Sequence, residues 1–161
     1  MKYSNSGISM LIICIFLCIT SCKSKTSEEI EIEIEKDYLV KTIEKITMDT
    51  TYQWIVILPG LGCHGCIQEA EYFMRQYITK RQILFVLTKI SSLKILQQKT
   101  EVNVNEHPNV YVDRSSLVSI PTRNNIYPCI IQLKEGKILN HSFQRPGNDA
   151  FHKLERIVSK Y

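Results

Sequence analysis

The residues best suited to chemistry are two cysteines three positions apart, Cys63 and Cys66, with His64 and Gly65 between them. A continuous apolar run, residues 53–58, precedes the pair, and apolar residues at helical spacing follow it. The pair is therefore expected at a helix N-terminus, where free N–H groups and the helix dipole favour negative charge. We expect Cys63 to ionise to a thiolate and Cys66 to resolve a mixed disulfide formed at Cys63.

Two further residues near the pair have both a functional and a plain interpretation. His64, when protonated, would lower the pKa of the neighbouring thiol, or it faces solvent without a role. Cys129 is either a small apolar core residue or a third thiol that reaches the pair.

The elements around the pair follow from apolar patterning. Alternating buried strands and helices predict parallel βαβ units, and a late β-hairpin around residues 134–137 adds antiparallel strands. We therefore predict an α/β fold with a mixed central sheet flanked by helices. The expected helices are residues 37–46, 66–77, 92–99 and 149–159, the last with Phe151, Leu154, Ile157 and Val158 inward. The expected strands are residues 53–58, 82–88, 109–112, 129–133 and 137–140.

The first residues are typical of an export signal. Lys2 precedes an apolar run, residues 8–19, that is short for a membrane span. The sequence Ile19-Thr20-Ser21-Cys22 resembles a bacterial lipobox, in which the signal is cut before a cysteine that then carries lipid. We predict a signal peptide at 1–21, a lipid anchor at Cys22 and a location facing the periplasm of a Gram-negative bacterium. An ordinary signal peptide or an anchor helix is the alternative, and export would let disulfides persist.

A charged stretch separates this anchor from the expected domain. Residues 29–35 alternate glutamate and isoleucine with a period of two. Such alternation indicates an edge strand or a solvated tether, and we predict a tether over 22–36 with the folded domain over 37–161.

Composition excludes several classes of protein. The 161 residues are 44% hydrophobic and 22% charged, with a formal net charge of +4, which is typical of one globular domain. A collagen, a largely disordered chain and a polytopic membrane protein are excluded. Lysine and arginine are not clustered and no nucleic-acid motif is present, so no nucleic-acid partner is expected.

The cysteine pair, the strand before it and the sequence Ile126-Tyr127-Pro128-Cys129 resemble the thioredoxin-like superfamily. The most similar group is the membrane-anchored TlpA/ResA-like thiol–disulfide oxidoreductases. The resemblance implies that Cys63 is the nucleophile and Cys66 the resolving thiol. It also implies that Pro128 is a cis-proline and that the Tyr127 backbone pairs with a substrate peptide.

The same resemblance implies a monomer that needs no cofactor, exchanges disulfides with protein thiols and has a possible redox partner in the membrane. Two positions depart from the family pattern. Gly62 stands where an aromatic residue is common, and Ile57 stands where thioredoxins have a proton-accepting acid.

Two other functions compete with an enzyme. The cysteine pair with His141 or His107 has ligand types that suit Cu(I) or zinc, as in a metallochaperone, although no closed ligand set is present. The domain could also be a binding or assembly module in which the Cys63–Cys66 disulfide only staples a turn. Turnover distinguishes an enzyme from such a module.

Overall fold

The computed structural model describes residues 25–160, so the predicted signal peptide and the lipid anchor at Cys22 lie outside the described residues. Within the described range, no helix is both long and apolar enough to cross a membrane. The chain separates into two compact units, Met1–Ile32 and Glu33–Tyr161. The second unit contains the sheet and the cysteine pair.

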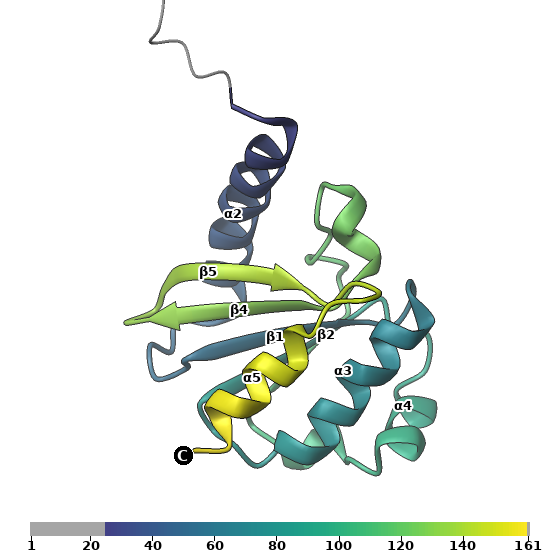
Figure 1. Ribbon diagram of the computed structural model, residues 1–161. Helices are drawn as coiled ribbons and strands as arrows, with labels where there is room; N and C mark the ends of the chain where they lie inside the picture. Colours follow the sequence, from purple (N-terminus) through teal and green to yellow (C-terminus); the bar gives the residue numbers. More distant parts are fainter. Residues whose placement is uncertain (1–24, 161) are drawn as a thin grey trace, which may run out of the picture. The chain divides into compact units, whose positions relative to one another are not determined.

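The predicted mixed sheet is confirmed. Its five strands have the order β3-β2-β1-β4-β5; β1 is parallel to β2 and β2 to β3, while β4 is antiparallel to both β1 and β5 (Figure 1). The strands are β1 Trp54–Pro59, β2 Ile83–Thr88, β3 Val110–Asp113, β4 Cys129–Lys134 and β5 Lys137–Phe143. The α-helices of the described residues are α2 Ser27–Ile46, α3 His64–Tyr77, α4 Leu93–Thr100 and α5 Ala150–Val158.

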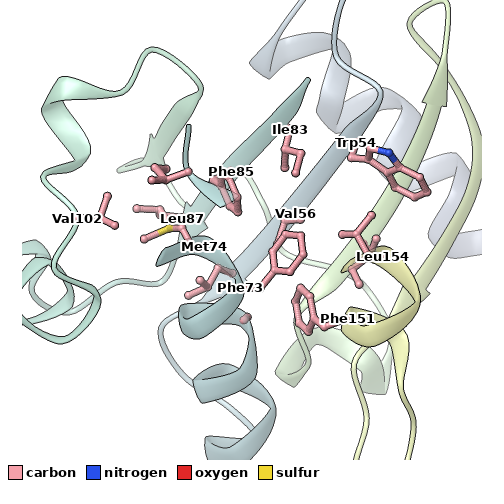
Figure 2. Packing of buried hydrophobic residues seen from close by; sticks show 14 of the residues in the cluster. Trp54, Val56, Phe73, Met74, Ile83, Phe85, Leu87, Val102, Phe151 and Leu154 are labelled. Atoms are coloured by element: carbon pink, nitrogen blue, oxygen red, sulfur yellow. The ribbon is translucent and has the colours of Figure 1, made fainter. Parts of the chain in front are cut away.

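One face of the sheet packs against α3 and α5. Phe73 of α3 is fully buried and contacts three aromatic rings: Tyr77 at 4.6 Å, Phe151 of α5 at 5.1 Å and Phe85 of β2 at 6.2 Å between centroids. Figure 2 shows Phe73 and Phe151 next to each other and close to Val56 of β1, with which they share one buried cluster. This aromatic cluster fixes α3, and with it the cysteine pair, on the central strand.

The other face packs against the C-terminal part of α2. Leu39 and Ile43 of this helix are buried in one cluster with Ile55 and Ile57 of β1 and with Cys129 of β4. Central strand β1 is buried along its whole length, as its continuous apolar sequence predicts.

The predicted tether is wrong, because residues 27–36 belong to α2. Asp37, where the predicted helix 37–46 begins, lies in the middle of α2. Glutamate and lysine are good helix formers, so a period of two does not impose a strand here. The helix starts at a capping box, in which Thr26 Oγ1 accepts from the Glu29 N–H and Glu29 Oε2 accepts from the Thr26 N–H.

The other predicted elements are confirmed to within a few residues. The hairpin turn places Glu135 at φ 52° and Gly136 at φ 75°, the positive angles typical of a two-residue type I′ turn. Phe151, Leu154 and Val158 of α5 are buried as predicted, whereas Ile157 is 42% exposed and its predicted burial is wrong. Ile157 lies in the last turn of α5, where it lines a surface pocket with Trp54 and Gln132 instead of entering the buried cluster.

Candidate active site

The cysteine pair lies at the start of α3, directly after β1, as the sequence predicts. Cys63 is the N-cap residue of α3 and forms a disulfide with Cys66, with 5.4 Å between their Cα atoms. Cys63 is half-buried and Cys66 is only 4% exposed. A reagent from solvent therefore reaches Cys63 first, and Cys66 is shielded beneath it.

A second loop, residues 122–128, lies against the disulfide. The Cys63 N–H donates to the Ile126 carbonyl at 3.0 Å. Gly62 makes this approach possible, because a Cβ atom at Gly62 would lie 2.1 Å from the Ile126 oxygen, and φ at Gly62 is +148°. The glycine that departs from the family pattern is thus the residue over which loop 122–128 packs.

The predicted cis-proline is wrong, since no described peptide bond is cis and the Tyr127–Pro128 bond is trans. Trans is the intrinsically favoured isomer of an X–Pro bond, and Tyr127 has φ −107° and ψ 146°, extended angles that suit a residue before proline. The Tyr127 N–H donates to the Asn124 carbonyl at 3.0 Å, so a substrate peptide could pair with Tyr127 only through other atoms.

Polar side chains at the carboxyl ends of β2 and β3 organise the neighbouring loop. Buried Asp113 accepts hydrogen bonds from the Thr88 hydroxyl at 3.1 Å and from the N–H groups of Leu117 at 2.9 Å and Val118 at 2.8 Å. Burial alone would raise the pKa of Asp113, but these hydrogen bonds outweigh it and hold the pKa below its usual value. The carboxylate therefore fixes the loop that follows β3.

A buried carboxylate that the sequence analysis missed lies on α2. Glu35 is 2% exposed and accepts hydrogen bonds from the side chains of Thr122, Asn124 and His141. The tether interpretation hid this residue, although the capping box at Thr26 would have indicated a helix that includes it.

The two other candidate residues, Cys129 and His64, lie in opposite surroundings, the first buried and the second exposed. Cys129 is a free, fully buried thiol, opposite Ile57 in the sheet register. Burial raises its pKa far above the usual value, and the charge of Glu35 raises it further, so Cys129 stays protonated. His64 is the exposed first residue of α3.

A metal centre finds no support among residues 25–160, where no three side chains of histidine, cysteine, aspartate or glutamate group as metal ligands do. His141, one of the two histidines considered as metal-ligand partners of the pair, contacts Glu35 instead, with 3.0 Å between its Nε2 and the carboxylate.

The arrangement offers one accessible sulfur, one shielded sulfur and a helix N-terminus that stabilises a thiolate. Chemically, these groups can exchange a disulfide through the outer sulfur. Comparison of the chain with protein-family models, with curated proteins and with solved structures finds no match.

Proposed function

We propose that the chain is a thiol–disulfide oxidoreductase with a thioredoxin-like fold, exported and held at a membrane by lipid on Cys22. The observation that carries this proposal is the Cys63–Cys66 disulfide at the N-terminus of α3, with the outer sulfur accessible and the inner one buried. A disulfide that only stapled a turn would need neither this asymmetry nor a helix N-terminus.

The order of elements supports the fold part of the proposal. A β1-α3-β2 parallel unit is followed by the β4-β5 hairpin and α5, and β4 lies beside β1 on the side away from β2. The segment before β4 lies against the first cysteine, as the resemblance to thioredoxin-like proteins implies. The trans Tyr127–Pro128 bond is the main departure.

The reaction starts with the reduced pair. The Cys63 thiolate attacks one sulfur of a substrate disulfide, which forms a Cys63–substrate bond and releases the first substrate thiolate. Cys66 loses its proton and attacks the Cys63 sulfur, which restores the Cys63–Cys66 disulfide and releases the second thiolate. Two electrons pass from the pair to the substrate; the proton that Cys66 loses goes to one of the two substrate thiolates, and the other thiolate takes its proton from solvent. The same steps in reverse oxidise a substrate dithiol.

The surroundings of the two sulfurs support different roles for them in this reaction. The N–H groups of the first turn of α3 and the helix dipole stabilise a thiolate at Cys63. Burial of Cys66 shields its own thiol from reagents in solution, and its place beside Cys63 leaves it as the thiol nearest to the mixed disulfide.

A trapping experiment tests this assignment. Full-length protein in detergent carries Cys14→Ala, Cys18→Ala and Cys22→Ala, so that Cys63, Cys66 and Cys129 are the only thiols. With Cys66→Ser added, a peptide disulfide is expected to leave a stable mixed disulfide at Cys63, detected by intact mass. Two controls add Cys63→Ser or Cys129→Ser to this Cys66→Ser protein. The protein with Cys63→Ser is expected to trap no peptide, and the protein with Cys129→Ser is expected to trap it as the Cys66→Ser protein does. A Cys66→Ser protein that traps nothing would contradict the proposal.

The lipid anchor needs its own test. Cells that express the full chain are grown with labelled palmitate, and the wild type is expected to incorporate label that Cys22→Ala abolishes. Equal labelling of both chains would contradict lipidation at Cys22.

A further inference from the structure

The buried cluster around Glu35 connects α2 to loop 122–128. Thr122 Oγ1 and Asn124 Nδ2 both donate to Glu35 Oε1, at 2.5 and 2.6 Å. His141 Nε2 lies 3.0 Å from Glu35 Oε2, and since a carboxylate can only accept, His141 carries its proton on Nε2. Two of the three partners of the carboxylate thus lie on the loop that contacts the disulfide.

Hydrogen bonds keep the buried Glu35 carboxylate in its ionised form. Burial by itself would raise its pKa, but hydrogen bonds from Thr122, His141 and Asn124 and the attraction of His141 outweigh burial and lower the pKa. Within residues 25–160, no buried side-chain polar atom lacks a hydrogen-bond partner. Loss of the carboxylate would leave the Thr122 and Asn124 donors unpaired in the interior, which the protein can relieve by moving the loop.

The loop continues from these two residues to the first cysteine. The short helix Arg123–Ile126 follows Thr122, and the Tyr127 N–H closes it on the Asn124 carbonyl. The carbonyl of Ile126, the last residue of this helix, accepts the Cys63 N–H. Glu35 therefore fixes one end of a four-residue helix whose other end is bonded to the cysteine pair.

We propose that Glu35 is a positioning residue that holds loop 122–128 on the cysteine pair, so that a polypeptide substrate is bound over Cys63. This inference rests on the proposed function. Ile126, whose carbonyl accepts the Cys63 N–H, is 42% exposed, and Leu61, two residues before Cys63, is 63% exposed, so both offer apolar surface near the pair to a polypeptide substrate. A small disulfide needs only the sulfur, so its reaction does not depend on the loop.

The rates at which two disulfides oxidise the reduced protein distinguish a positioning role of Glu35 from a general loss of structure. The reduced full-length protein, with Cys14→Ala, Cys18→Ala and Cys22→Ala, is mixed in detergent with hydroxyethyl disulfide or with an unstructured peptide closed by one disulfide. With Glu35→Ala we expect the second-order rate for the peptide to fall about tenfold, the effect of losing one or two hydrogen bonds. The rate for hydroxyethyl disulfide is expected to change less than about twofold, because the first-turn N–H groups of α3 that stabilise the Cys63 thiolate remain in place.

Two further variants make the result specific. Glu35→Gln keeps a side-chain oxygen that accepts from Thr122 and Asn124. Its NH₂ group can donate to Nε2 of His141 when that histidine carries its proton on Nδ1. The rate with the peptide is therefore expected to stay close to that of the wild type. Asn109→Ala is the matched control: buried Asn109 donates to the carbonyls of Ile78 and Ile83 far along the chain from the loop. Its loss is expected to lower stability without changing the ratio of the two rates.

Hydrogen exchange at the Cys63 amide tests the geometry without turnover. Glu35→Ala is expected to speed this exchange relative to wild type, and Asn109→Ala is not. The inference is overturned if Glu35→Ala slows both oxidants equally, if Asn109→Ala changes their ratio in the same way, or if exchange at Cys63 is unchanged. If the wild type reacts with neither disulfide, the proposed function fails, and exchange at Cys63 alone decides whether Glu35 holds the loop.

Discussion

Substitution of Gly62 by alanine tests the packing of loop 122–128 on the cysteine pair. A Cβ atom would lie 2.1 Å from the Ile126 oxygen, inside any real contact, and would have to occupy a φ of +148°. Such a backbone angle costs a non-glycine residue about 1–3 kcal/mol. Displacement of Ile126 also removes the hydrogen bond from the Cys63 N–H, worth about 1 kcal/mol.

The two losses together predict a destabilisation of about 2–4 kcal/mol. For a domain of this size, each kcal/mol lowers the unfolding midpoint by about 3–5 °C, so Tm is expected to fall by about 6–20 °C. The assay is thermal unfolding of the oxidised protein followed by circular dichroism.

Gly65 is the matched control, since it lies in the same turn. A Cβ atom there would meet nothing within 4 Å. Because Gly65 is inside α3, alanine is expected to keep Tm or to raise it slightly through better helix propensity. The reasoning is refuted if Gly62→Ala keeps the wild-type Tm, or if Gly65→Ala lowers Tm as much as Gly62→Ala does.

Three further predictions concern the core, the pH dependence and the disulfide. Phe73→Ala empties the centre of the aromatic cluster and is expected to cost about 3–5 kcal/mol in urea unfolding; a cost below about 1 kcal/mol would contradict the packing. The lowered pKa of Asp113 stabilises the fold above the unfolded-state pKa, and this contribution is lost as pH falls through the folded-state pKa. The stability difference between wild type and Asp113→Asn is therefore expected to be larger at neutral pH than near pH 3, and a constant difference would count against the carboxylate. Iodoacetamide added to the reduced native protein is expected to modify Cys63 before Cys129, as read by peptide mass; faster labelling of Cys129 would contradict its burial.

The sequence predicts the sheet and most helices well because their signals are local. The buried strand 53–58, the amphipathic spacing of 66–77 and the Glu135-Gly136 turn each depend on a few neighbouring residues. The cysteine pair at a helix N-terminus follows from the same local signals.

The Glu35 cluster could not be predicted in the same way. Its partners are 87 to 106 residues away in the chain, so their meeting depends on tertiary packing. The alternation of glutamate and isoleucine also favoured a strand or tether over the helix that carries Glu35, whereas the capping box at Thr26 and the helix propensity of glutamate and lysine favoured the helix. The trans bond before Pro128 is the isomer that local preference favours, and the cis prediction came from the resemblance to thioredoxin-like proteins.

The central claim is that Cys63 and Cys66 form a reversible redox pair, and a glutathione titration tests it most directly. Full-length protein in detergent is equilibrated across ratios of reduced to oxidised glutathione, alkylated, and read by peptide mass. The account predicts a two-electron transition confined to Cys63 and Cys66, whose midpoint also shows whether the protein donates or accepts electrons. A pair that stays oxidised even under strong reductant would be a structural staple and would contradict the account.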